Sequence, residues 1–536
     1  MRIDYLRRDG HMNTRDWKGL AVAAVLLCLA AAGCTDPTVA PKSTVTSANI
    51  FTDPGSYRQF LARTYAGLIV TGQAGPSGNA DIGGIDEGFG EYLRLYWYLQ
   101  EMPTEEAVIG WNDPGLPDLN TGLWGADNSM VNAMYYRVFY QVMMANEFLR
   151  QTVDDSLDAR GQSDLMDEVH QYRAEARFLR ALSYWHGIDL FGNIPLVTDA
   201  DELTATPPQQ STRAEIFDYV VSELGDIRDD LPTASASTYG RATAGAADML
   251  LAELYLNAEV YTGTEHWADA RTAAESVIGS GVYSLAPDFR NNFQSDNNTS
   301  PEIIFAALQD GNRTQTWGGM TFLIHAGCGG SMSSADYGID YCWGGYRMKQ
   351  QAYRLFDTAN DGRASFFWTD GQTDSVIEIG SFGSGIAAPK FTNKTSTGAN
   401  GQQLGMVDTD FPIFRLGEAY LIYAEAVLRG GGGSRAQALT YVNALRQRAY
   451  GNASGDIVDA ELTLDFILAE RGRELLFETR RRADLIRFGL FTGGTYLWAW
   501  KGGTAGGTAT DAFRDLYPLP ANELIANPNL TQNPGY

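Results

Sequence analysis

Apolar residues recur every three or four positions over long stretches of the chain, which is the spacing of one face of an α-helix. This pattern predicts helices over residues 56–70, 129–149, 165–191, 213–228, 243–260, 267–278, 416–429 and 436–450. The last four ranges form two pairs, each joined by a short polar or glycine-containing breaker. Alanines that allow close helix contact, with tyrosines filling between them, are typical of tetratricopeptide-like helical hairpins. The pattern therefore predicts a mainly α protein.

Two regions break this pattern. Residues 91–98 and 102–124 combine many aromatic side chains with prolines and glycines, so we expect neither stretch to form a helix. Residues 283–411 hold only short apolar pieces amid Gly, Asn, Ser and Thr, which predicts a loop-rich insert between the helical pairs. Loops held by a rigid scaffold often carry the binding residues of a protein.

Residues 466–488 combine helical spacing with an unusual density of charge. Ten of the eighteen residues from Glu470 to Arg487 are charged. Spacings of three and four predict that Glu478 pairs with Arg481 and Arg482, and that Asp484 pairs with nearby arginines. We interpret these four side chains as structural ion pairs on a packed helix. The alternative is a solvated surface helix, since charge runs usually face water.

The N-terminus has the features of an export signal. Arg15 and Lys18 precede an apolar run over residues 20–32, and the sequence Ala-Ala-Gly before Cys34 is similar to a bacterial lipobox. We expect a signal peptide over 1–33, a tether over 34–48 with Cys34 lipidated, and a single domain over 49–536. An ordinary cleavable signal with an incidental cysteine is the alternative, and Met12 is an alternative start.

The net charge narrows the class of partner, and the cysteines predict a disulfide. The 40 basic and 65 acidic residues give a net charge of −25, which becomes −27 without residues 1–33 and argues against a nucleic-acid partner. Cys28 lies in the signal, so the mature chain keeps Cys328 and Cys342 besides Cys34. In an oxidising compartment we expect those two to form a disulfide. The five histidines lack metal-ligand spacing.

Compact enzyme motifs are missing from the sequence. It contains no G-x-S-x-G, H-E-x-x-H or Walker sequence. Glu105 with Glu106, or Asp357 with Asp361, could form a glycosidase pair, but an acid-rich chain produces such pairs by chance. Asp357, Asn360 and Asp361 could also bind a structural calcium ion, although the usual spacing of loop ligands is lacking. We therefore expect a protein that is not an enzyme and has no cofactor.

Aromatic residues with polar neighbours are the candidates for ligand binding. One group is Trp111 with Asn112 and Asp113. The insert supplies a second group, which is Trp317, Tyr337, Tyr341, Trp343 and Tyr346. Flat rings stack on the C–H faces of sugars, while amide and charged groups bind the hydroxyls. For each ring singly, packing in the core is an even alternative. The aromatics predicted to lie in the core are Trp97, Tyr184, Trp185, Tyr255 and Trp267.

Four blocks in order carry a family resemblance. They are AEARFLRALSYWHGIDLFGNIPLV (174–197), FPIFRLGEAYLIYAEAVLRGG (411–431), LAERGRELLFETRRRADLIRFG (468–489) and YPLPANELIANPNLTQNPGY (517–536). With the lipobox, these blocks resemble the SusD/RagB family of outer-membrane nutrient-binding lipoproteins. Ala31 stands where the lipobox more usually has leucine. The binding loops show no recognisable match, so no binding residue is carried over from the family.

The resemblance implies a fold and a role. The fold would be a superhelical scaffold of tetratricopeptide-like pairs with an irregular ligand-facing region. The protein would be lipid-anchored and surface-exposed at the outer membrane, capture oligosaccharides without chemistry, and deliver them to a SusC-like TonB-dependent transporter. Peptide binding on the same scaffold, a helical-repeat scaffold without a ligand, and a surface glycosidase are the alternatives.

Overall fold

The computed structural model describes residues 50–72, 75–77, 80–202, 204 and 206–536. The predicted signal peptide (1–33) and the whole predicted tether (34–48), with Cys34, lie outside these residues. Contacts divide the chain into a unit of residues 1–53 and a unit Pro54–Tyr536, and the second unit contains every element discussed below. Within the described ranges, no helix has the length and apolarity needed to cross a membrane.

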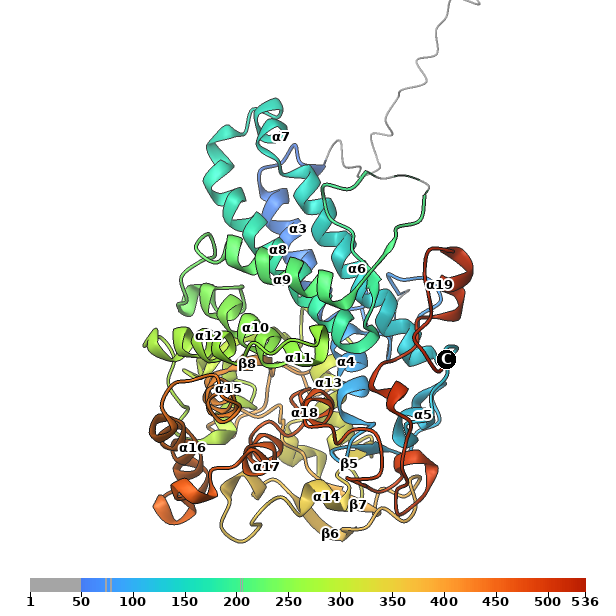
Figure 1. Ribbon diagram of the computed structural model, residues 1–536, viewed down its shortest axis with the longest axis vertical. Coiled ribbons are helices and arrows are strands. Elements are labelled where there is room, and N and C mark those ends of the chain that lie inside the picture. Colours follow the sequence, from blue (N-terminus) through green and yellow to red (C-terminus); the bar gives the residue numbers. More distant parts are fainter. Residues whose placement is uncertain (1–49, 73–74, 78–79, 203, 205) are drawn as a thin grey trace, which may run out of the picture. The chain divides into compact units, whose positions relative to one another are not determined.

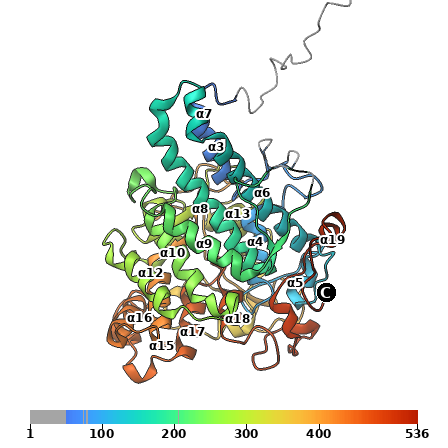
Figure 2. The ribbon, with the colours of Figure 1, turned by 45° about the horizontal axis from the view of Figure 1, so that its top comes forward.

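Four helices from the first half of this unit pack side by side. They are α3 (Gly55–Ala66), α6 (Ser129–Gln151), α8 (Met166–Phe191) and α9 (Arg213–Ile227). Figure 2 shows α3, α6 and α8 together. Side-chain caps fix where helices begin: Asn128 accepts the N–H groups of Met130 and Val131 at the start of α6. Thr212 and Glu215 form a capping box on α9. A short helix, α7 (Asp154–Ala159), lies between α6 and α8 in the chain.

The two predicted helical pairs are confirmed and continue this stack. The helices are α10 (Ala244–Leu256), α11 (Ala258–Thr262), α12 (Trp267–Gly279), α15 (Leu416–Leu428) and α16 (Arg435–Tyr450). Each of α9, α10, α12, α15 and α16 packs on the next, and Figure 1 shows them in succession. The contact of α12 with α15 joins pairs that the insert separates in sequence. The fold is a mainly α, tetratricopeptide-like scaffold.

The prediction of no helix is wrong for residues 91–98, because Tyr92–Glu101 form α4 with all ten residues buried. It holds for most of 102–124, where Leu116–Thr121 form the short helix α5 and Val108–Ile109 form the strand β1. The carboxylate of Glu91 caps α4 by accepting the N–H groups of Leu93 and Arg94. The segment Tyr92–Glu101 itself contains no proline or glycine. The residues that argue against a helix lie outside it, at Gly90 and Pro103 and beyond, so they bound α4 without breaking it.

The charged segment is also not one helix. It forms α17 (Leu464–Glu474) and α18 (Arg481–Arg487), separated by a break in which Phe477 and Thr479 have φ of 63° and 64°. Non-glycine residues in this conformation are strained and need support from their surroundings. Buried carboxylates provide it: Glu106 accepts the N–H of Phe477 at 2.8 Å, and Glu101 accepts that of Thr479 at 2.5 Å.

Short strands tie the insert to the scaffold. All pairs are antiparallel: β1 (Val108–Ile109) with β5 (Tyr346–Arg347), β2 (Ile194–Pro195) with β3 (Gln210–Ser211), β4 (Ile303–Ala307) with β8 (Phe411–Arg415), and β6 (Trp368–Thr373) with β7 (Gly385–Ala387). The remaining helices are α13 (Gly319–Gly327), α14 (Gln350–Tyr353) and α19 (Ala521–Ala526). The β1–β5 pair joins the 102–124 block to the insert.

Candidate functional site

Four aromatic side chains from three separate segments of the chain meet at one place. The ring centroids of Trp111 and Trp343 are 6.4 Å apart, and those of Trp317 and Trp343 are 6.2 Å apart. The ring of Tyr341 lies 6.3 Å from that of Trp343. We call these four residues the aromatic site. The structure thus joins members of both candidate groups, which the sequence analysis treated separately.

Backbone contacts hold the segments that carry these rings. Trp111 follows β1, while Tyr341 and Trp343 precede β5, so the β1–β5 pair places them together. The N–H of Trp343 donates to the carbonyl of His325 at the end of α13 at 2.8 Å. A Cβ atom at position 345 would lie 2.8 Å from the Trp111 ring. Glycine at 345 is therefore needed for the ring of Trp111 to pack at this point.

The disulfide loop forms one wall of the site. Cys328 and Cys342 are bonded, with their Cα atoms 4.8 Å apart. The N–H of Gly344 also donates to the carbonyl of Cys328 at 2.8 Å. At the far side of the loop, Tyr337 is partly buried and its carbonyl accepts the N–H of Asn393 at 2.9 Å. The loop that carries Tyr341 is thus fixed at several points.

Tyr346 does not belong to the binding surface, and its prediction as a ligand-binding residue is wrong. Its side chain is fully buried and its hydroxyl donates to the carbonyl of Leu323 at 2.8 Å. The ring lies 5.1 Å from that of Trp97, which is itself buried. Phe322 contacts both Trp97 and Trp111, at 5.5 and 6.0 Å between centroids. Together Trp97, Phe322 and Tyr346 form an aromatic floor beneath the site.

Arg94 of α4 positions two walls of the site and was missed by the sequence analysis. Its guanidinium donates to the carbonyl of Trp317 at 2.9 Å and lies 4.4 Å from the centroid of the Phe322 ring. It also lies 5.8 Å from the Trp111 ring. One turn earlier, Glu91 accepts the N–H of Gly319 at 2.7 Å. No local pattern signals these roles, because α4 is distant in sequence from the insert.

The exposed rim of the site is aromatic and polar. Tyr341 leaves 54% of its surface exposed, while Trp111, Trp317 and Trp343 are partly exposed. Asn112 is exposed and Asp113 is partly so, which places amide and carboxylate groups beside the ring of Trp111. Burial lowers the pKa of His325, which underlies Trp343 at 4.7 Å between centroids, so this imidazole is neutral at pH 7. The groups exposed at the rim are flat rings, an amide and one carboxylate, while the guanidinium of Arg94 is buried, so the surface suits an uncharged ligand.

The core aromatics agree with the sequence prediction in part. Trp97, Tyr184 and Trp185 are buried. Tyr255 and Trp267 are only partly buried and pack against the helical stack. Neither of them contributes to the aromatic site.

The acid pairs considered for catalysis are committed to internal contacts. Glu105 is buried and pairs with Arg481 at 2.5 Å, and Asp361 is buried and pairs with Arg363 at 2.8 Å. Asp357 accepts the side-chain N–H of Asn360 at 2.8 Å within its own turn. Across the described residues, no group of three or more His, Cys, Asp or Glu side chains is arranged to hold a metal ion.

Two family models match the chain. The SusD family model covers residues 367–536, and a model described as "Starch-binding associating with outer membrane" covers residues 117–256. The starch-binding protein SusD of Bacteroides thetaiotaomicron is 32% identical over 538 residues, which span 90% of this chain and 93% of that protein. The chain belongs to the SusD family.

Solved structures of SusD proteins share this fold. A SusD superfamily protein of Bacteroides thetaiotaomicron aligns with a TM-score of 0.70 over 91% of this chain and 100% of that one, at 21% identity. Surface glycan-binding protein A of the same species, solved with laminarihexaose, aligns with a TM-score of 0.68 over 89% of this chain and 98% of that one, at 20% identity. At these identities the likeness establishes the fold alone.

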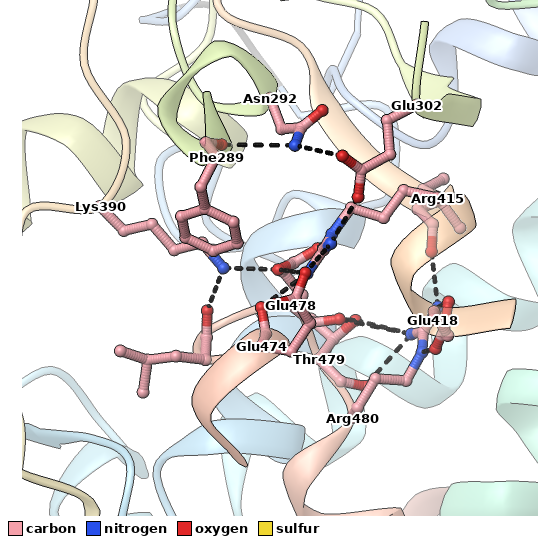
Figure 3. A network of polar contacts seen from close by, with 12 residues as sticks. Phe289, Asn292, Glu302, Lys390, Arg415, Glu418, Glu474, Glu478, Thr479 and Arg480 are labelled. Atoms are coloured by element: carbon pink, nitrogen blue, oxygen red, sulfur yellow. Dashed lines mark hydrogen bonds and ion pairs between the residues drawn. The ribbon is translucent and has the colours of Figure 1, made fainter. Parts of the chain in front are cut away.

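The charged block, one of the four that carry the resemblance to the SusD family, lies in the interior. Arg415, at the end of β8, contacts Glu302 at 2.9 Å, Glu474 at 2.6 Å and Glu478 at 2.6 Å (Figure 3). Glu478 also accepts from Lys390 at 2.5 Å. Each of these five side chains is buried. The network ties α17 and the break after it to β4, β8 and the insert.

The ion pairs of this block have other partners than the sequence spacing predicted. Arg481 pairs with Glu105, and Arg482 pairs with Asp189 at 3.0 Å. Asp484 contacts Arg487, as predicted, at 2.7 Å, and also Arg471 at 2.8 Å. Burial alone would raise the pKa of Asp484, but the two guanidinium groups outweigh it and lower the pKa to about 2. The four charges predicted to be structural are buried in the SusD scaffold, three of them with distant partners.

Proposed function

We propose that the aromatic site binds neutral oligosaccharides, and glucans in particular. The observation that carries this proposal is the convergence of Trp111, Trp317, Tyr341 and Trp343, with part of each ring exposed. Sugar rings offer C–H faces that stack on such surfaces, and Asn112 can bind their hydroxyls. The starch-binding relative and the fold neighbour solved with laminarihexaose support a glucan as ligand.

The binding would take place without a chemical change in the ligand. An inverting or retaining glycosidase needs two carboxyl groups that flank the scissile bond. Glu105 and Glu106 lie in the interior, where Glu105 pairs with Arg481 and Glu106 accepts the N–H of Phe477. These contacts support a binding protein.

The location and the partner extend the same proposal. We infer that the chain is anchored by a lipid on Cys34 at the outer membrane and passes its ligand to a SusC-like TonB-dependent transporter. The lipobox-like sequence and the family model described by association with the outer membrane support this inference. Co-purification of a TonB-dependent barrel with the tagged protein from outer membranes is the test, and repeated failure to find one would contradict the inference.

Affinity electrophoresis of tryptophan variants tests the ligand. We expect Trp111→Ala and Trp343→Ala each to weaken retardation by starch or laminarin at least about tenfold, which is about 1.4 kcal/mol. Trp267→Ala is the matched control, because Trp267 is also partly buried but lies on α12 away from the site. Unchanged mobility of both site variants, or binding of peptides in place of glycans, would contradict the proposal.

A further inference from the structure

A second cavity lies apart from the aromatic site, at the junction of the helical stack and the insert. It has a volume of about 620 Å³, within the range of about 300–1,000 Å³ typical of ligand pockets. Its walls come from the linker between α9 and α10, from the segment after α12, and from the loop that precedes β4. None of the four residues of the aromatic site lines it.

Among the residues that the structure describes, none of those lining this cavity carries a charged side chain. Its polar groups are hydroxyls and one amide: Ser235, Thr238, Thr243, Asn298, Thr299 and Ser300. The chain as a whole is 20% charged with a net charge of −25, so an uncharged lining excludes ligands that need an ionic partner. The lining therefore suits a neutral, hydroxyl-rich ligand.

Two tyrosine rings in the cavity are held in place. The hydroxyl of Tyr239 donates to Asp410 at 2.9 Å. Tyr283 reaches over the first turn of α10, where a Cβ atom at position 245 would lie 2.5 Å from its hydroxyl. Glycine costs a helix about 0.5–1 kcal/mol relative to alanine. Gly245 thus makes room for Tyr283 at some expense to the helix.

The mouth of the cavity combines apolar and polar groups. Val282 is 51% exposed at the rim, and Ile303 and Ile304 of β4 are buried behind it. The side-chain amide of Asn298, which is exposed, makes no hydrogen bond within the described part of the chain. Fixed rings, an apolar rim and an unused amide are together the features that recognise a sugar.

We propose that this cavity is a second carbohydrate site, which takes a terminal unit or short segment of a neutral oligosaccharide. The choice of a sugar among neutral polyols rests on the proposed function, whereas the existence of the site rests on the cavity. A branched or long glycan bound at one site would be present at a high effective concentration at the other, so two sites on one chain would retain it better.

Ligand-observed saturation-transfer NMR with maltohexaose and laminarihexaose tests this proposal. The starting protein is the double variant Trp111→Ala/Trp343→Ala, which removes the aromatic site. We expect weak saturation transfer to remain for at least one of the two sugars. Adding Asn298→Trp, which fills the mouth of the cavity, should reduce it at least tenfold. Ser222→Trp, an exposed position on α9 outside the cavity, should leave it unchanged.

The outcomes separate the two proposals. Wild-type binding by the double variant would overturn the aromatic site but not the cavity. No residual saturation transfer to either sugar, or a residual signal that Asn298→Trp does not reduce, would overturn the cavity. Val282→Trp, at another position on the rim, replaces Asn298→Trp if circular dichroism shows that the latter is unfolded.

Discussion

The charged helices α17 and α18 bury charged side chains, whereas the aromatic site exposes aromatic ones. Each arrangement is the reverse of the usual one. Arg471, Arg482 and Glu470 are fully buried, whereas Tyr341 leaves 54% of its surface exposed. Charged residues are almost never fully buried unless they are paired, and large aromatics are more often packed than displayed. Both regions are therefore exceptions that need a physical reason.

The two regions differ in whether their side chains already have partners. Glu470 contacts Arg363, Arg446 and Arg473, at 2.8, 2.9 and 2.7 Å. These guanidinium groups outweigh the effect of burial and lower the pKa of Glu470 to about 2. The rings of the aromatic site contact one another and the residues beneath them, and leave part of their surface to solvent. Buried charges with ionic partners indicate a structural role, and exposed ring surface indicates a binding role.

Removing one member of a buried ion pair should have the largest effect on stability. Asp484→Ala would leave Arg471 and Arg487 buried without their shared carboxylate. We expect the free energy of unfolding to fall by about 3–5 kcal/mol in urea titrations, while the folded fraction keeps its affinity for the glucan. Arg482→Ala, which strips Asp189 of its partner, should act in the same direction.

An exposed pair gives the matched control for this prediction. Arg435 and Asp459 are 2.7 Å apart with much of both side chains exposed. Asp459→Ala should cost about 1 kcal/mol or less, because water and salt screen such pairs. A selective loss of glucan affinity in Asp484→Ala, with stability unchanged, would instead make the charged helices part of the binding site.

Two tyrosines five residues apart sharpen the same comparison, with Tyr341 in the disulfide loop and Tyr346 in β5. Tyr346→Ala should destabilise the protein by about 3 kcal/mol, because it empties a buried site and removes the hydrogen bond to Leu323. Tyr341→Ala should change stability by less than about 0.5 kcal/mol but weaken glucan binding several-fold. Urea unfolding and affinity electrophoresis on both variants measure the two effects. If Tyr341→Ala behaves like Tyr346→Ala, the distinction between floor and surface fails.

The helical pairs could be predicted from sequence because their contacts follow the helical period. Residues 416–429 and 436–450 correspond closely to α15 and α16. The ion-pair partners could not be predicted, since Arg481 and Glu105 lie 376 positions apart in the chain. Spacing within a helix identifies only pairs that lie three or four positions apart. The same limit concealed the role of Arg94, which acts on the carbonyl of Trp317 from another part of the chain.

The residues of the aromatic site could be predicted from the sequence as candidates for binding, but their meeting at one place could not. Trp111 and Trp343 were both recognised, yet only the β1–β5 pair brings them together. Tyr341 is exposed, Trp343 is partly exposed and Tyr346 is buried. These differences depend on the path of the loop after α13, which no periodic sequence pattern predicts. The break after α17 was likewise hidden, because Phe477 and Thr479 adopt conformations that their residue types disfavour.

The carboxyl groups that hold this break, those of Glu101 and Glu106, are buried and make no salt bridge within the described part of the chain. Burial raises the pKa of Glu101 to about 7. Burial also raises the pKa of Glu106, and the carboxylate of Glu101 raises it further. The folded protein therefore holds a proton that the unfolded chain releases near its ordinary pKa of 4.5. Stability from this group is present below about pH 4.5 and is lost as the pH rises through 7.

Glu101→Gln should remove this pH dependence with the smallest change in structure. The amide oxygen can still accept the N–H of Thr479, and the side chain stays neutral at every pH. One proton corresponds to about 1.4 kcal/mol per pH unit. In urea titrations at pH 5, 6 and 7, the free energy of unfolding should therefore fall with pH less steeply in the variant than in the wild type, by up to that amount per pH unit. Glu259→Gln, at an exposed position on α11, should leave the slope of the wild type. Equal slopes in Glu101→Gln and the wild type would mean that Glu101 is ionised in the folded state, and the left-handed turn at Thr479 would then be held by a charge.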